Sequence, residues 1–195
     1  MSAIPKRPTK QIVDRFINKF KKNKRYFPAD QAIAELFRQY PKNTNLNHVL
    51  LKVTILDKLY STGIFFPVDM ARHIVSLKID AKLQNQSTEV VDCISRAEFN
   101  KKRRHVFSFA TKYCSWHDSA NYPIYDTYVA QLLTAYSRRD AFAVFEKAEL
   151  RNYARYKEIV SAFRKYYTLD DYSFKEMDKF LWIYGKELFK KEARK

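Results

Sequence analysis

The scarcity of glycine limits what this chain can fold into more than any other feature of its sequence. Among 195 residues there are two glycines, Gly63 and Gly185. Phosphate loops and dinucleotide-binding turns need several glycines, because the backbone there approaches the ligand closely. Sheet-rich folds also place glycine in many tight turns. The sequence therefore excludes both kinds of nucleotide site and argues against a sheet-rich fold, and we expect no cofactor.

Apolar residues recur at the three- and four-residue spacing of amphipathic helices along the whole chain. One such stripe is Ile12, Phe16 and Phe20, with a helix start at Thr9, and another is Val49, Val53 and Leu56, with Asn45 as a candidate cap. Pro67 suits the first turn of a further helix. The abundant Leu, Lys, Glu and Ala residues also favour helices. The sequence therefore predicts an all-α fold of about nine helices.

Neither an internal repeat nor a low-complexity linker divides the chain. A length of 195 residues suits one domain. We therefore expect a single compact multi-helix domain over residues 1–195, with a core at about 45–190 and N-terminal helices in 1–44 packed on it.

The charge balance is strongly basic, with 37 Lys and Arg residues against 21 Asp and Glu and a formal net charge of +16. Such a charge points to a polyanionic partner, either nucleic acid, an anionic membrane surface or an acidic protein. No apolar run approaches the roughly 18 residues of a membrane span, and residues 1–10 lack the apolar centre of a signal peptide. We expect a cytoplasmic, monomeric protein that binds double-stranded DNA, with no membrane partner.

The cysteines and histidines do not form a recognisable metal or disulfide pattern. Cys93 and Cys114 have no CxxC partner, and the four histidines are scattered. We therefore expect no metal site and interpret the cysteines as small buried residues.

The densest basic segment is Lys101, Lys102, Arg103 and Arg104, just before a helix expected at 106–116. Cations there, together with backbone amides at a helix start, favour a phosphate. We interpret Lys101, Arg103 and Arg104 as DNA-binding residues. A solvated charge run is the alternative.

A second motif is Pro-Ile-Tyr-Asp-Thr-Tyr-Val at 123–129, after a loop at 117–123. It puts Asp126 at the first position of a helix. A plain capping role, with about 1 kcal/mol of stabilisation, is the alternative to any chemical role for this carboxylate.

The helix expected at 106–116 is followed by a loop and then by the Pro-x-x-Asp-x-x-Val spacing of 123–129. This order resembles the active-site segment of the helix-hairpin-helix DNA glycosylases, especially the archaeal-type 8-oxoguanine glycosylases. The resemblance extends over about 45–182 and rests on order and spacing. It implies a glycosylase-like fold in which Asp126 is the catalytic carboxylate.

The same resemblance implies a base pocket and a DNA contact. Asp178 and Trp182 match an Asp and a Trp, four residues apart, that help to line the base pocket of the archaeal-type enzymes. Tyr125 would stack on the flipped base. Tyr60 and Ser61 lie where the family has its strand-wedging loop, and are further DNA-binding candidates.

The chain departs from the family at two places. Residues 97–102 contain no glycine where the family has a glycine-rich hairpin, so the basic segment would grip the phosphate instead. The lysine that forms a Schiff base in bifunctional members falls near Arg104 or His105, and arginine does not deprotonate. Lys101 or Lys102 could instead form the Schiff base, and so could Lys112, which would lie in the expected base pocket. The remaining alternative is a monofunctional enzyme without such a lysine, and we favour it.

These observations predict a DNA glycosylase, a hydrolase that flips a damaged or modified base out of the duplex and excises it, leaving an abasic site for repair. One alternative is a defence glycosylase that acts on modified bases in phage DNA. Others are a non-enzymatic helical module that binds DNA or RNA, and an adaptor whose basic surface binds an acidic protein.

Overall fold

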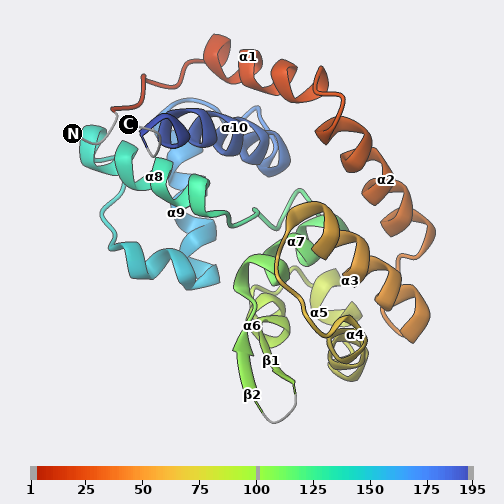
Figure 1. Cartoon of the computed structure of the whole chain (residues 1–195). Coiled ribbons are helices and arrows are strands. Elements are labelled where there is room, and N and C mark those ends of the chain that lie inside the picture. The colour runs from red at the N-terminus through yellow and green to blue at the C-terminus, as the bar shows by residue number, and fades with distance from the viewer. Residues whose placement is uncertain (1–3, 100–101, 193–195) are drawn as a thin grey trace. The chain divides into compact units, whose positions relative to one another are not determined.

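The computed structural model describes residues 4–99 and 102–192 and has an all-α fold (Figure 1). It is 67% helical, and the described ranges contain ten α-helices. The predicted fold class is therefore confirmed, with one helix more than the nine expected.

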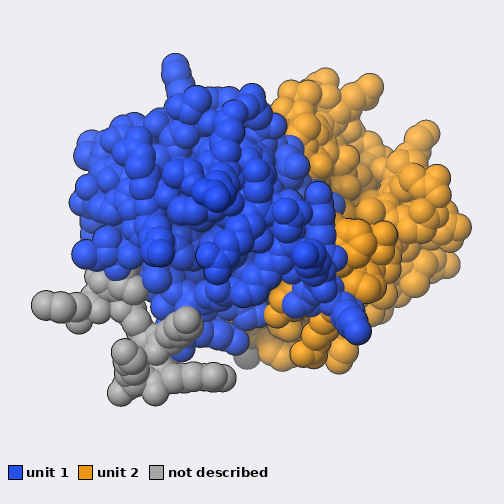
Figure 2. Space-filling view, turned by 90° about the horizontal axis from the view of Figure 1, so that it is seen from above, with its two compact units in different colours: residues 1–24, 123–195 blue, residues 25–122 orange. Residues whose placement is uncertain are grey.

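Internal contacts divide the chain into two compact units (Figure 2). Unit 1 combines residues 1–24 with 123–195, and unit 2 is residues 25–122. The first helix belongs to unit 1 and the second to unit 2, so segment 1–44 contributes to both. The single domain expected for 1–195 stays a prediction, and one cooperative unfolding transition would be its signature.

Unit 1 is built around its C-terminal helix, which packs against the first helix of the chain and against α8. Phe16 from the first helix stacks on Tyr184 with 4.9 Å between ring centroids. The elements of the unit are α1 (Lys10–Lys21), α8 (Thr127–Asp140), the 3-10 helix η1 (Lys147–Arg151), α9 (Tyr153–Tyr166) and α10 (Phe174–Glu192).

Side-chain caps fix where two of these helices begin. The Thr9 hydroxyl accepts a hydrogen bond from the Ile12 amide, and an Asp126 oxygen accepts one from the Tyr128 amide at 2.8 Å. Such caps satisfy amides that have no partner within the helix. The predicted starts after Thr9 and at Asp126 are both confirmed.

Gly185 lets α10 lie directly against the first turn of α8. A Cβ atom at this position would come within 2.7 Å of the Tyr128 carbonyl oxygen. Real Cβ atoms do not approach backbone that closely, so the two helices need glycine here.

We therefore expect Gly185→Ala to destabilise the protein by about 1–3 kcal/mol, because the clash with backbone outweighs the higher helix propensity of alanine. Urea unfolding followed by circular dichroism measures the change. Unfolding at the same or higher urea concentration than the unsubstituted protein would contradict the close approach.

Unit 2 has α3 at its centre, packed against α2, α4 and α7, while α6 packs against α7. Val49, Val53 and Leu56 of α3 are fully buried, as their spacing predicted. The elements are α2 (Tyr26–Gln39), α3 (Leu46–Tyr60), α4 (Pro67–Ser76), α5 (Asp80–Gln84), α6 (Glu89–Ser95), β1 (Arg96–Phe99), β2 (Lys102–His105) and α7 (Phe107–His117).

An antiparallel hairpin of β1 and β2 carries residues 102–104 of the basic segment. Ala97 pairs with Arg104 and Glu98 with Arg103. Ala97 and Phe99 are buried while Arg96 and Glu98 are exposed, which is the alternation of a half-buried strand. Helical periodicity did not predict this hairpin, which places residues 102–104 in a defined strand.

None of the helices in the described ranges is both long and apolar enough to cross a membrane.

Candidate active site

Two tyrosines of α9 fasten the segment that leads into α8. The Tyr153 hydroxyl donates to the Pro123 carbonyl at 3.1 Å, and the Tyr156 hydroxyl donates to the Ile124 carbonyl at 2.5 Å. Both rings are buried. Buried hydrogen bonds of this kind fix the backbone, and they hold the chain immediately before Asp126.

The carboxylates of Asp126 and Asp178 both act on the Tyr156 phenol. Burial raises the pKa of Tyr156 far above its ordinary value, and the negative charges of Asp178 and Asp126 raise it further. Asp126 and Asp178, the carboxylate pair, thus come from distant parts of the sequence and both act electrostatically on one buried phenol in unit 1.

Asp126 caps α8 with one carboxylate oxygen only. Its Oδ1 accepts from the Tyr128 amide, while Oδ2 makes no hydrogen bond among the described residues. The side chain is half-buried. Asp126 can therefore both cap α8 and take part in a reaction, since the cap orients its carboxylate and leaves Oδ2 for another group.

One face of α10 carries Asp178, Trp182 and Gly185, which are spaced by four and three residues. Since Gly185 touches the backbone of Tyr128, this face lies toward the first turn of α8. Trp182 is half-buried, and the Lys186 ammonium lies 4.4 Å from its ring centroid.

Tyr125 is buried between an aromatic ring and a cation. Its ring meets Tyr156 edge-on with 5.6 Å between centroids, and the Arg151 guanidinium lies 5.6 Å from the Tyr125 ring centroid. Tyr125, which was predicted to line the base pocket, therefore lies beside Tyr156.

In unit 2 the structure brings together Lys112 and Tyr60. The Lys112 ammonium lies 5.4 Å from the Tyr60 ring centroid and donates to Ser108 Oγ at 2.7 Å. The indole of Trp116 donates to the Tyr60 hydroxyl at 3.2 Å. Lys112 is 3% exposed, so its ammonium is held inside unit 2.

The other predicted DNA contacts of unit 2 are at its surface. Arg103 and Arg104 are exposed on β2, and Ser61 is exposed at the end of α3 in a left-handed conformation. Lys101 and the side chain of Lys102 lie outside the described residues, so their predicted roles stay predictions.

A buried polar network centred on Asn43 escaped the sequence analysis. Asn43 Oδ1 accepts from Lys52 Nζ at 2.7 Å and from the Tyr113 hydroxyl at 2.6 Å, with His117 Nε2 at 3.1 Å. The Asn43 side-chain amide donates to Asp80 at 2.7 Å. The one sequence signal was Lys52, which falls on the apolar stripe of α3.

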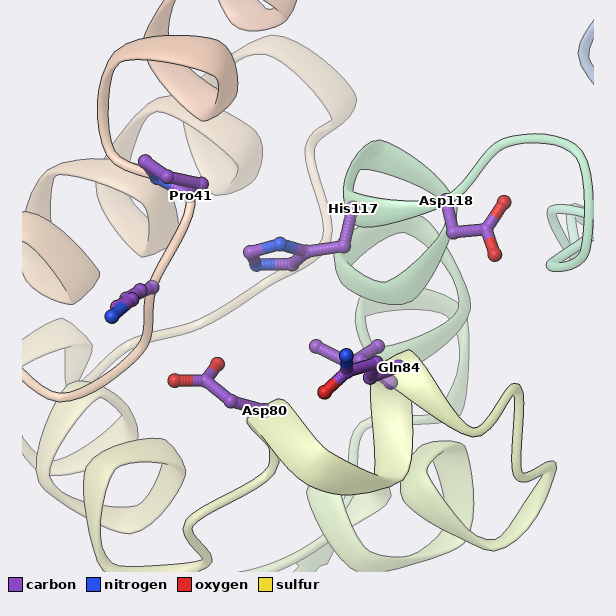
Figure 3. Close-up of a pocket in the computed structure, with 7 residues that line it drawn as sticks. Pro41, Asp80, Gln84, His117 and Asp118 are labelled. Carbon is purple, nitrogen blue, oxygen red and sulfur yellow. The ribbon is translucent and has the colours of Figure 1, made fainter.

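The network borders a cavity of about 330 Å³ in unit 2. Figure 3 shows His117 reaching it from α7 and Asp80 and Gln84 from α5. The described residues contain no cluster of three or more His, Cys, Asp or Glu side chains that could hold a metal ion. The lining residues are Pro41, Lys42, Asp80, Leu83, Gln84, His117 and Asp118.

The His117 ring lies between the Lys52 ammonium and Asn43. Lys52 Nζ has three oxygen acceptors, the carbonyls of Tyr40 and Lys42 and the Asn43 side chain. His117 Nε2 lies 3.4 Å from Lys52 Nζ and 3.1 Å from Asn43 Oδ1. Burial, helped by the Lys52 charge, lowers the pKa of His117 to about 3, and burial lowers that of Lys52 to about 8.

This neutral histidine predicts acid sensitivity. In the unfolded chain His117 takes up a proton below about pH 6.5, but in the folded protein only near pH 3. The unfolded state therefore binds more protons in this window, and stability falls as the pH falls from 6.5 toward 3. We expect the unfolding free energy to decline more steeply over this range than that of His117→Gln, in urea titrations. A constant difference between the two proteins would contradict the lowered pKa of His117.

The fold and the site define a basic, all-α protein with a carboxylate pair in one unit and a buried cationic network in the other. The HI_0787_N family, described as an N-terminal domain, matches residues 12–122, so the chain belongs to this family. The match ends at the last residue of unit 2, and the carboxylate pair lies beyond it.

An uncharacterized protein of Haemophilus influenzae (strain Rd) is 36% identical to the chain over 150 residues, which are 76% of this chain and 72% of the relative. No solved structure matched the chain. Neither name states an activity.

Proposed function

We propose that this protein is a DNA glycosylase that hydrolyses the bond between a damaged or modified base and its deoxyribose. The observation that carries the proposal is the Asp126 carboxylate, which caps α8 through Oδ1 at the end of a segment fastened by Tyr153 and Tyr156. The proposal includes action in the cytoplasm on double-stranded DNA, without a cofactor.

Sugar hydrolysis needs a carboxylate that faces developing positive charge on the sugar ring. Asp126 suits this role, because capping fixes its direction and leaves Oδ2 available. The two tyrosine–carbonyl bonds before it keep the carboxylate in place, so little reorganisation is needed when the bond breaks.

Asp178 suits recognition of the flipped base. It lies on the same α10 face as Trp182, whose flat ring is half-buried. A carboxylate that accepts hydrogen bonds from a base edge, next to a ring on which the base stacks, is a common arrangement for an extruded base.

The burial of Lys112 supports a monofunctional enzyme, because a Schiff base requires an accessible, deprotonated amine. We expect sodium borohydride to trap no covalent complex between the protein and substrate DNA, as judged on denaturing gels. A bifunctional glycosylase of known activity serves as the positive control. A trapped band would contradict hydrolysis by water alone and would direct attention to Lys101 and Lys102.

The test of the proposal is an activity screen. The purified protein is incubated with duplexes that carry one oxidised, alkylated, deaminated or glycosylated base, and abasic sites are detected by alkali cleavage. We expect abasic sites in at least one duplex and none in the unmodified control. DNA binding without abasic sites across the panel would support a non-enzymatic binding module instead.

A further inference from the structure

Exposed apolar side chains are concentrated in one stretch of unit 2. Of the nine large hydrophobic residues that are exposed among the described residues, six lie between 46 and 68. Phe65 is the extreme case of that stretch, at 83% exposure, and its neighbour Phe66 is 40% exposed. A bare aromatic ring next to a second one costs solubility, which indicates a partner that covers it.

The loop that carries Phe65 is held rigidly. Asp57 Oδ1 accepts hydrogen bonds from the Thr62 hydroxyl at 2.9 Å and from the Ile64 amide at 2.8 Å. Gly63 adopts a left-handed conformation, with φ at 78°, and the side chain of Ile64 is buried. Phe65 therefore directly follows an anchored segment, and binding through it costs little ordering of the chain.

The aromatic loop, residues 63–66, adjoins the basic hairpin. The rings of Phe66 and Phe99 lie 6.1 Å apart, which joins the loop to β1, and α4 packs against β1 (Figure 1). The described hairpin exposes three arginines on its two faces. Arg96 and Arg103 lie on one face with Glu98. Arg104, opposite Ala97, lies on the same face as Phe99. A flat apolar ring and a group of cations are thus presented by neighbouring segments of one unit.

We propose that the aromatic loop and the hairpin form a surface for nucleic acid with unpaired bases, in which Phe65 stacks on a base and the arginines contact phosphates. An unpaired nucleotide has a base with a flat apolar face and a charged phosphate close to it. This surface offers an aromatic ring for the base and arginines for the phosphate. An acidic protein would match the arginines but would leave Phe65 without a flat partner. The proposal concerns binding by unit 2 and does not rest on cleavage by Asp126.

Binding of the full-length protein to unmodified fluorescein-labelled DNA tests this surface by fluorescence anisotropy. The ligands are a single strand, a duplex with one unpaired base and a fully paired duplex. We expect Phe65→Ala to weaken binding to the first two by roughly 10-fold, the size of one base–aromatic stacking contact, and to affect the paired duplex less. Phe65→Trp should restore the affinity.

Salt dependence separates stacking from charge. The slope of the logarithm of the single-strand binding constant against the logarithm of the salt concentration reports the number of phosphate contacts. The double variant Arg103→Ser/Arg104→Ser should reduce this salt slope by about 1.4, since each phosphate contact contributes about 0.7. Phe65→Ala should leave that slope unchanged. Val144→Ala, which trims another exposed apolar side chain at 86% exposure, is the matched control and should bind as the unsubstituted protein does.

Unchanged single-strand affinity in a folded Phe65→Ala variant would overturn the proposal, whether or not the loop binds a protein. An equal loss for all three ligands would also overturn it, because stacking requires an unpaired base. Since the DNA is unmodified and no cleavage is measured, a failure here is distinct from a failure of the proposed glycosylase.

Discussion

Asp126→Asn is expected to lower the rate of base release by at least about 100–1,000-fold, the range seen when one pre-positioned transition-state contact is removed. Asparagine keeps the shape of the side chain and the ability to cap α8, but it carries no negative charge. The rate should therefore fall while the protein stays folded. Single-turnover release from the best substrate of the activity screen measures the effect.

A matched control is Asp118→Asn in unit 2. Asp118 also accepts backbone hydrogen bonds with its carboxylate, from Ala120 and Asn121, and it lies outside the carboxylate pair. We expect its base release to be within about twofold of normal, because capping alone tolerates asparagine. Equal rates for Asp126→Asn and the unsubstituted protein would mean that Asp126 only caps its helix.

Asn43→Leu is expected to destabilise the protein by about 3–5 kcal/mol, because three buried polar groups lose one shared partner and each such loss costs about 1–3 kcal/mol. Lys52 is fully buried and loses the side-chain acceptor for its ammonium. The hydroxyl of Tyr113 and the imidazole of His117 lose the same acceptor. Chemical denaturation with far-UV circular dichroism measures the change.

Two further variants test the reason for this loss. Asn45→Ala removes the exposed cap of α3, which accepts from the amides of Asn47 and His48, and should cost about 1 kcal/mol. Adding Lys52→Met to Asn43→Leu should recover part of the stability, because it removes a buried ammonium that has lost one of its acceptors. If Asn43→Leu costs no more than Asn45→Ala, the network does not stabilise unit 2 as described.

The helices were predictable because their signals are local. Thr9, Asn45 and Asp126 cap helices where the sequence placed helix starts, and each does so through its own side-chain oxygen. Pro67 likewise begins α4. By contrast, the β1–β2 hairpin depends on pairing between strands, which helical periodicity does not register.

The candidate site was only partly predictable, because its partners come from separate helices. Spacing placed Asp178 and Trp182 on one helix face, and a motif singled out Asp126. Nothing in the sequence marked Tyr156 as a residue that fastens the segment before Asp126, since it reads as one apolar position of α9. Contacts between residues that are distant in the sequence place Tyr156 there, and a single sequence does not show such contacts.

The Asn43 network illustrates the same point in unit 2. Lys52 stood on an inward stripe of α3, which marks a lysine as unusual. Its acceptors come from the segment before α3, and the ring beside it comes from the end of α7. Such a group of partners follows from the packing of helices and not from any spacing along the chain.

The most direct measurement of the central claim is mass spectrometry of the small molecules released from modified duplex DNA by the purified protein. The glycosylase account predicts a free base in the same molar amount as the abasic sites, and at least about 100-fold less of both products from Asp126→Asn in the same time. Released nucleotides or strand breaks without a free base would contradict the account, as would a free base released equally by Asp126→Asn.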